Sequence, residues 1–327
     1  MKNIAFVILL ISTSLFSQKL SKVENVINAY PKMATIEELA SKIDKDFKSE
    51  FDKVKAIYTW LALNIDYDLG NPRLLKAPEV YFYTTEENLE RRKKSINKLL
   101  VLNVFETKKA ICKGYALTFK KICDILKIEN EVIKGYVKTS PFDIMFIPKN
   151  KNHIWNAIKI NNKWRYLDVT FGAGYISNFR WHRKLEPFYF DIKEEDLNLS
   201  YYPSEKKWIN TLDQNTLEVF SNKPIYNTPY FSSKAKLISP LVGKITTQKK
   251  KKITLKLLGL KPDTKILYFY SKENIYKEAF YKNRTSYSEI VLIQSCRKII
   301  TFFYKIPCLL IDVLSLKKII KIFNKKT

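Results

Sequence analysis

The hydrophobic positions between residues 22 and 70 follow a helical period. In the stretch 51–68, apolar and aromatic residues recur three or four positions apart and so share one side of a helix: Val54, Ile57, Tyr58, Leu61 and Ile65. Trp60 in the same stretch is predicted to be a core residue. Gly70-Asn71-Pro72 predicts the end of this helix, and residues 72–98 predict a polar, charge-rich connection.

A second helix is predicted from Cys112 to Lys127, and its apolar face consists of Ala116, Phe119, Cys123 and Leu126. Residues 131–137 then alternate like a strand. Two further strands are predicted, over residues 154–160 and 163–171. They flank Asn161-Asn162, a residue type that tolerates the positive φ of a tight hairpin turn.

From residue 213 the pattern changes to short alternating runs. Residues 252–257 and 265–270 predict strands, which suggests a small all-β sandwich. Residues 299–327 form blocks of apolar residues and lysines, and Lys305, Pro307 and Asp312 interrupt them, which argues against a membrane span. A length of 327 residues is typical of two domains, which we expect over residues 18–212 and 213–327.

The first residues have the pattern of a cleavable signal peptide. Lys2 precedes an uncharged run over residues 4–16, and Ser17 is a small residue at the expected cleavage point. We therefore expect an exported protein, whether periplasmic, cell-surface or secreted. No cysteine follows Ser17, so a lipoprotein anchor is not expected. The alternative is a buried N-terminal strand or helix, although the run has no amphipathic period.

Four cysteines bear on the compartment and on the chemistry: Cys112, Cys123, Cys296 and Cys308. In a helix, Cys112 and Cys123 share a face but lie ~16 Å apart along the axis. That separation is too large for a disulfide. A Cys296–Cys308 disulfide stays open, and export would permit it.

Composition and charge narrow the class of protein. The chain is 46% hydrophobic, which provides enough apolar material for real cores and excludes a largely disordered protein. Its net charge is +26, and residues 213–327 hold 23 Lys and Arg against 7 Asp and Glu, a net +16. This favours contact with an anionic membrane or cell-wall polymer, unless it reflects a general compositional bias toward lysine. Nucleic acid is a less expected partner, because no ordered arginines or known motif accompany the lysines.

The glycines of the chain cluster in one segment. Only seven glycines are present, and four of them fall within 61 residues: Gly114, Gly135, Gly172 and Gly174. Glycine in a glycine-poor chain tends to mark backbone that needs unusual freedom or close approach. The same segment contains a cysteine, a histidine and an aspartate that suit one site.

Cys112 is placed like a cysteine nucleophile. It stands at the start of a predicted helix, where unpaired N–H groups and the positive end of the helix dipole stabilise a thiolate. Lys109 and Lys113 add positive charge nearby. Taken alone, Cys112 could equally be a small buried hydrophobic residue.

The positions of His153 and Asp168 favour the interpretation of Cys112 as a nucleophile over that of a buried hydrophobic residue. If Asn161-Asn162 closes a two-residue hairpin, facing positions add to 323, so Trp155 faces Asp168 and His153 faces Thr170. His153 and Asp168 then share one face of the hairpin as diagonal neighbours. A carboxylate can hold one imidazole nitrogen while the other addresses a thiol, which is the arrangement of a nucleophile, a base and the group that orients the base.

These residues resemble a known family. Residues 107–116, 153–156 and 164–168 look like the Cys, His and Asp motifs of the transglutaminase-like superfamily. The helix that ends in Ile65-Asp66-Tyr67-Asp68 resembles the segment that commonly precedes the Cys motif there. Residues 187–190 and 202–208 resemble the kyphoscoliosis peptidase-type subgroup. The other histidine, His182, has no comparable partner and is interpreted as a surface or structural residue.

The resemblance covers about residues 50–212 and implies an α+β, papain-like or transglutaminase-like core. Its nucleophile helix would pack against an antiparallel sheet, with Cys112 as nucleophile, His153 as base and Asp168 as orienting group. A small all-β domain would follow this core.

The implied activity is acyl transfer or hydrolysis at amide bonds of a protein or peptide substrate, with a peptidase or amidase favoured over an amine cross-linking enzyme. The alternative is a catalytically silent binding or scaffold protein that docks to an anionic surface through its basic C-terminal region. No cofactor is expected. No carboxylates cluster as in a calcium loop, so no metal is expected either. For the oxyanion, only the backbone N–H of Cys112 is assigned.

Overall fold

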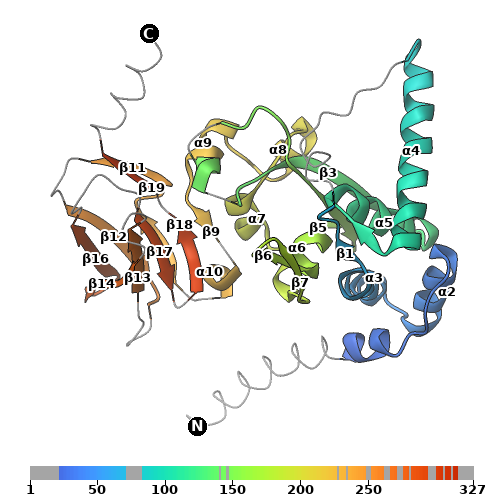
Figure 1. Ribbon diagram of the computed structural model, residues 1–327, viewed down its shortest axis with the longest axis horizontal. Coiled ribbons are helices and arrows are strands. Elements are labelled where there is room, and N and C mark those ends of the chain that lie inside the picture. Colours follow the sequence, from blue (N-terminus) through green and yellow to red (C-terminus); the bar gives the residue numbers. More distant parts are fainter. Residues whose placement is uncertain are drawn as a thin grey trace. The chain divides into compact units, whose positions relative to one another are not determined.

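The computed structural model describes residues 22–70, 83–139, 141–144, 147–226, 228–232, 235–247, 252–260, 266–270, 275–279, 281–293, 300–304, 306–310 and 312–315 (Figure 1). Its contacts divide the chain into two compact units. The first takes residues up to Lys134 together with Asn152–Lys193, and the second takes Gly135–Lys151 and the chain from Glu194 onward. The expected signal peptide and the side chains of Cys296 and Cys308 lie outside the described residues. The expected domain limit at residue 212 falls within the second unit and stays a prediction.

Helices form most of the first unit. Residues 22–28 are helical, and five labelled helices follow: α2 (Ile36–Asp46), α3 (Glu50–Asn64), α4 (Glu86–Thr107), α5 (Cys112–Ile125) and α6 (Val169–Ala173). A hydroxyl side chain caps the start of α2, α3 and α4, since Thr35, Ser49 and Thr85 each accept a hydrogen bond from the backbone three residues ahead. None of the helices in the described part of the chain is long and apolar enough to cross a membrane.

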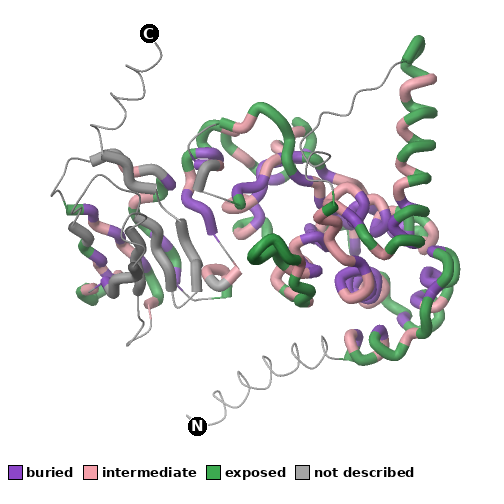
Figure 2. The backbone as a smooth tube through the Cα atoms, in the orientation of Figure 1, coloured by how far each residue is buried: buried purple, intermediate pink, exposed green. Residues whose placement is uncertain are grey.

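Helix α3 forms the centre of this unit, and Figure 2 shows it buried along most of its length. The five residues expected on its inner side are all buried, and Trp60 is only 2% exposed, so both predictions are confirmed. The expected end at Gly70 is wrong, because the helix ends at Asn64. Ile65 takes an extended conformation, and Asp66–Tyr67 forms strand β1, which pairs in parallel with Lys109–Ala110, strand β2.

The connection expected over residues 72–98 is also wrong for its second half, because α4 begins at Glu86. Leu89 is the only apolar residue in the first ten positions of this helix, so they give no apolar period. Ion pairs between neighbouring turns support them, with Lys93 2.7 Å from Glu90 and Arg91 3.9 Å from Glu87. Apolar residues of α4 are buried only near its end. Residues 72–82 of the expected connection lie outside the described residues.

The strands β3 (Asn130–Val137), β4 (His153–Ile160) and β5 (Lys163–Leu167) form a sheet in the order β5-β4-β3, and β3 belongs to the first unit up to Lys134. Asn161 and Asn162 take φ values of 52° and 60°, the left-handed conformation of a two-residue hairpin. Asn156 faces Leu167, which is the predicted register. Helix α5 packs against β4. The predicted helix and hairpin are therefore confirmed.

The second hairpin strand ends earlier than expected. The sequence predicts strand through Phe171, but β5 ends at Leu167 and α6 follows directly. Asp168 causes this change, because its Oδ1 accepts a hydrogen bond from the backbone N–H of Phe171 at 3.1 Å and so caps the helix. Gly172 lets α6 lie against α3, since a Cβ there would overlap the buried hydroxyl of Tyr58.

The remaining elements of the first unit are β6 (Gly174–Ser177), β7 (Arg180–Arg183) and the short helix η2 (Pro187–Tyr189). The second unit begins with short helices and strands: η1 (Pro141–Ile144), α7 (Glu194–Ser200), β8 (Tyr201–Pro203), α8 (Lys206–Thr211), α9 (Leu217–Asn222), β9 (Ile225–Tyr226) and α10 (Thr228–Ser232). Within this unit, β8 pairs with residues 135–137 at the end of β3.

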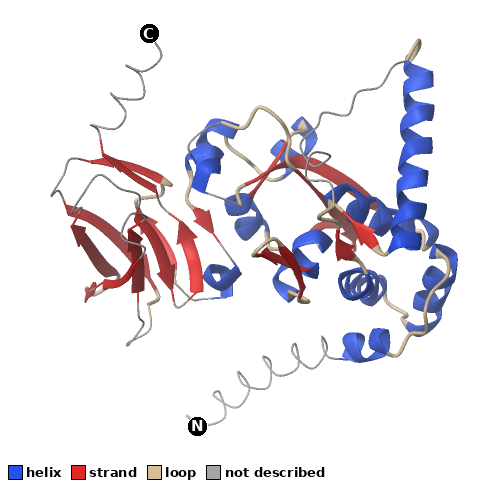
Figure 3. Cartoon of the chain, viewed as in Figure 1, coloured by secondary structure: helices blue, strands red, loops and turns tan. Residues whose placement is uncertain are grey.

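Strands make up the part of the second unit described after residue 235 (Figure 3). They are β10 (Lys236–Ser239), β11 (Lys244–Thr247), β12 (Lys252–Leu258), β13 (Ile266–Tyr270), β14 (Ile275–Ala279), β15 (Tyr281–Asn283), β16 (Ser288–Ile293), β17 (Ile300–Tyr304), β18 (Ile306–Leu310) and β19 (Asp312–Ser315). Two sheets have the orders β10-β12-β16-β15 and β14-β13-β17-β18-β9, and β11 pairs with β19. The predicted α+β class with C-terminal strands is confirmed.

Candidate active site

Cys112 is the first residue of α5, and it is half-buried and not part of a disulfide. The pairing of β1 with β2 holds the chain just before it, and the N–H of Asp68 donates to the carbonyl of Ala110 at 2.9 Å. Gly114 allows the first turn of α5 to approach α4, because a Cβ there would meet the side chain of Val104 at 2.9 Å. Ile111 at the cap position provides no capping side chain, so the first-turn N–H groups near the sulfur have no side-chain cap.

His153 is the first residue of β4 and is only 6% exposed. Its Nε2 lies 2.5 Å from Oδ2 of Asp168. The imidazole is nearly parallel to the ring of Phe171, with centroids 4.5 Å apart, and to that of Trp155, with centroids 6.4 Å apart. These contacts fix the ring in one orientation.

Asp168 is fully buried, and its two carboxylate oxygens have different partners. Oδ1 caps α6, while Oδ2 contacts His153. The backbone N–H of Asp168 donates to the carbonyl of Tyr189 at 2.9 Å. The two carboxylate oxygens and the backbone of Asp168 are therefore each held in place, which suits a group that orients a base.

The three predicted residues come together in the first unit. Burial lowers the pKa of His153, but the Asp168 carboxylate and a hydrogen bond to Cys112 raise it more, so that the pKa reaches about 10. The imidazole is then protonated at neutral pH. Since Nε2 faces Asp168, the nitrogen left for the Cys112 sulfur is Nδ1. The geometry is that of a nucleophile, a base and an orienting carboxylate, and their catalytic role stays a prediction.

Asn156 links the histidine strand to the cysteine helix. It is 1% exposed on β4, and its Nδ2 donates to the carbonyl of Ala116 on α5 at 3.1 Å. The sequence motif His153 to Asn156 therefore does two things. Its first residue faces the thiol, and its last holds the strand against the helix that carries the thiol.

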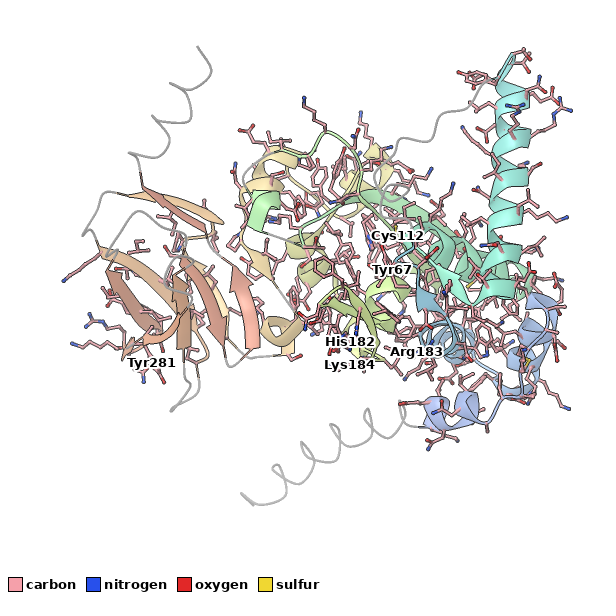
Figure 4. All side chains as sticks on the ribbon, viewed as in Figure 1. Tyr67, Cys112, His182, Arg183, Lys184 and Tyr281 are labelled. Atoms are coloured by element: carbon pink, nitrogen blue, oxygen red, sulfur yellow. The ribbon has the colours of Figure 1, made fainter. Side chains whose placement is uncertain are left out.

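Tyr67 is a further residue of the site, and the sequence pattern alone does not assign it a role. Its pairing with Ala110 places it beside the start of α5, and Figure 4 shows Tyr67 and Cys112 close together. Burial, with the nearby Cys112 and Asp168, raises the pKa of Tyr67 to about 12, so its hydroxyl remains a hydrogen-bond donor. The Tyr67 ring packs against the Trp181 ring, with ring centroids 5.7 Å apart. The sequence feature that could have identified Tyr67 is its position in the segment Ile65 to Asp68, which resembles the segment that precedes the Cys motif.

His182 lies away from this constellation. It is exposed on β7 and stacks on Tyr175, with ring centroids 5.1 Å apart. The neighbouring Arg183 forms an ion pair with Asp66, which ties the β6–β7 hairpin to β1 (Figure 4). The interpretation of His182 as a surface residue agrees with this position. Within the described ranges, no group of three or more His, Cys, Asp or Glu is arranged to hold a metal ion.

Residues 37–169 match the model of the transglutaminase-like superfamily. This part of the chain is similar to that superfamily, and we call it the transglutaminase-like domain. The matched range contains all three of Cys112, His153 and Asp168, and it includes β4, β5 and the helices from α2 to α5. The family resemblance drawn from the three motifs is confirmed.

Relatives of the transglutaminase-like domain include two peptidases. The chain is 20% identical to human kyphoscoliosis peptidase over 224 residues, which is 68% of this chain and 31% of the relative. It is 21% identical to the kyphoscoliosis peptidase of Mus musculus over 200 residues, 60% of this chain and 27% of the relative. The chain thus spans less than a third of the length of these relatives. The crystal structure of a TGase shares 21% identity, covering 49% of this chain and 36% of that one, with a TM-score of 0.27.

Proposed function

We propose that the transglutaminase-like domain is a thiol enzyme that cleaves amide bonds in a protein or peptide substrate, with Cys112 as its nucleophile. One observation carries this proposal. The buried His153 ring contacts the Asp168 carboxylate at 2.5 Å and also hydrogen-bonds to Cys112. A protonated imidazole beside a cysteine stabilises the thiolate, which is the reactive form of the side chain.

In the first step, the Cys112 thiolate attacks the carbonyl carbon of the scissile amide and a C–S bond forms. The carbonyl oxygen becomes an oxyanion, which needs hydrogen-bond donors. We assign this role to the backbone N–H of Cys112 at the start of α5 and to the Tyr67 hydroxyl. The raised pKa of Tyr67 supports this assignment, because the hydroxyl keeps its proton at neutral pH.

In the second step, His153 gives its proton to the leaving amine, the C–N bond breaks, and a thioester to Cys112 remains. The neutral imidazole then takes a proton from water, and the oxygen of that water attacks the thioester carbonyl. The carboxylic acid leaves, which regenerates the thiolate and the imidazolium. Asp168 keeps the ring in place throughout.

An amine in place of water would make the same site a cross-linking enzyme, since both reactions share the thioester. We favour hydrolysis, because the relatives of this chain include proteins named as peptidases. A domain that keeps the fold without turnover is the remaining alternative.

The test uses a mixture of glutamine-containing peptides, incubated with the purified chain with and without a primary amine and followed by mass spectrometry. Hydrolysis gives pairs of fragments whose masses add up to the peptide plus one water, and Cys112→Ala forms none. His182→Ala is the control and keeps the activity, because His182 is exposed and outside the site. Products that carry the amine would replace the peptidase with a cross-linking enzyme. Unchanged turnover in Cys112→Ala would refute the assignment of the nucleophile.

We also propose where the enzyme works. The signal-peptide pattern of residues 1–17 supports export, and the net charge of +16 on residues 213–327 supports contact with an anionic membrane or cell-wall polymer. The chain is expected to sediment with vesicles rich in anionic lipid at low salt and not with zwitterionic vesicles. Equal binding to both kinds of vesicle would remove the electrostatic basis of this role.

A further inference from the structure

Helix α4 has two apolar faces, and the described residues bury only one of them. Val101, Val104 and Phe105 are buried against the first unit. Three other aliphatic residues of the same helix are exposed: Ile96 at 42%, Leu99 at 65% and Leu102 at 51%. Figure 2 shows α4 exposed along most of its length.

The three exposed residues form one stripe. They recur at intervals of three, and at 3.6 residues per turn Ile96 and Leu102 point within roughly 60° of Leu99. The buried Val104 points about 140° away from Leu99, so the stripe faces away from the core. Single exposed aliphatic residues are normal on a protein surface. A continuous stripe of three on one helix is typical of an interface.

Charged residues mark the two ends of this stripe. Arg92 and Glu106 lie seven residues before and after Leu99, so each returns to within about 20° of the same direction, roughly 10 Å from Leu99 along the axis. Glu86, Glu87 and Glu90 point to the other side of the helix. The outward face therefore has Arg92 at one end, the three aliphatic residues with Ser95 and Asn103 in the middle, and Glu106 at the other end.

We propose that this face of α4 binds the same face of a second copy of the chain, with the two helices antiparallel and a two-fold axis at Leu99. In this register Leu99 meets Leu99 of the second copy, and Ile96 meets Leu102. Arg92 meets Glu106 at both ends, because a two-fold interface repeats every contact. The stripe on one copy thus matches the stripe on the second copy both in its apolar residues and in its charges.

Other arrangements fit this charge pattern less well. Parallel helices would place Arg92 against Arg92 and Glu106 against Glu106, which is repulsive at both ends. An anionic membrane surface would attract Arg92 but repel Glu106. The antiparallel pair alone gives attraction at both ends, and opposite charges beside an apolar seam commonly set helix orientation.

The contact is one helix wide and has three aliphatic residues on each copy. An interface of this kind is smaller than that of a permanent dimer, which commonly buries more than about 2,000 Å². We therefore expect a reversible dimer with a dissociation constant in the micromolar range. Monomer and dimer should interconvert with protein concentration.

Sedimentation equilibrium of the purified full chain across the micromolar range tests this arrangement. The wild type is expected to dimerise, and Leu99→Glu is expected to weaken the dimer at least tenfold, because it places two like charges at the two-fold axis. Leu99 is 65% exposed, so this change should not disturb the fold. Unchanged alkylation of Cys112 in each variant checks that the first unit is intact.

Charge exchange tests the register itself. Arg92→Glu or Glu106→Arg alone should weaken the dimer about tenfold, and the two together should restore it to within about twofold of the wild type. Lys94→Glu is the matched control, since it changes the net charge as much as Arg92→Glu but points away from the stripe. A monomeric wild type, a dimer insensitive to Leu99→Glu, or a double variant as weak as the single ones would overturn the proposal.

Discussion

Replacing His153 with alanine is expected to slow the alkylation of Cys112 by iodoacetamide about 100-fold at pH 6. A free thiol with an ordinary pKa of about 8.5 is roughly 0.3% thiolate at this pH. In the folded chain the His153 pKa of about 10 keeps the imidazole positive, so a thiolate beside it is stabilised. Removing the ring removes that charge and the hydrogen bond it makes to the sulfur.

The rate is measured from pH 5 to pH 10, with the modified cysteine identified by peptide mapping. His182→Ala is the matched control, because it removes the other histidine of the chain from an exposed position, and its profile should equal that of the wild type. Cys123 is fully buried and should remain unmodified in all three proteins. If the His153 variant reacts as fast as the wild type at pH 6, the proposed thiol activation is wrong.

The free energy of unfolding should fall as the pH rises above about 6.5, because of His153. His153 binds its proton more tightly when folded, with a pKa of about 10 against an ordinary value of 6.5. This interaction therefore contributes its full stability below about pH 6.5 and loses it as the pH rises toward 10. The free energy of unfolding should fall by up to about 1.4 kcal/mol per pH unit in that window relative to the His153 variant.

The sequence could predict this site because its two decisive features are local. Asn161-Asn162 determines the hairpin register by turn chemistry, and the register alone places His153 and Asp168 on one face. The position of Cys112 follows from the helical period that begins there. Short-range patterns therefore define each part, and the family resemblance joins the cysteine to the other two.

The features that could not be predicted depend on contacts between distant segments or on polar chemistry. Tyr67 reaches the site through the pairing of β1 with β2, which gives no periodic signal in two residues. The first turns of α4 are supported by ion pairs rather than an apolar stripe, so they resemble a loop in sequence. The switch from strand to helix at Asp168 depends on one capping bond.

Replacing Asp168 is expected to have the largest effect on stability, because one buried side chain performs two tasks. Asp168→Ala removes the cap of α6 and leaves the His153 imidazole without its carboxylate. Breaking a buried pair by removing one partner costs about 3–5 kcal/mol of the free energy of unfolding. Urea denaturation at pH 7 measures this loss. Asp191→Asn is the control, since Asp191 pairs with Arg165 in a more exposed position, and about 1 kcal/mol or less should be lost there.

Asp168→Asn separates the two tasks. Its amide oxygen can still accept the N–H of Phe171, so the cap of α6 should survive, whereas the negative charge beside His153 is lost. The stability of this variant should therefore lie between those of the wild type and Asp168→Ala. The pKa of His153, followed by NMR of its ring, should drop markedly, because burial then opposes protonation with no carboxylate to offset it. Alkylation of Cys112 at pH 6 should fall with it. A variant that keeps both a highly basic His153 and a reactive Cys112 would mean that the carboxylate caps the helix and does nothing for the thiol.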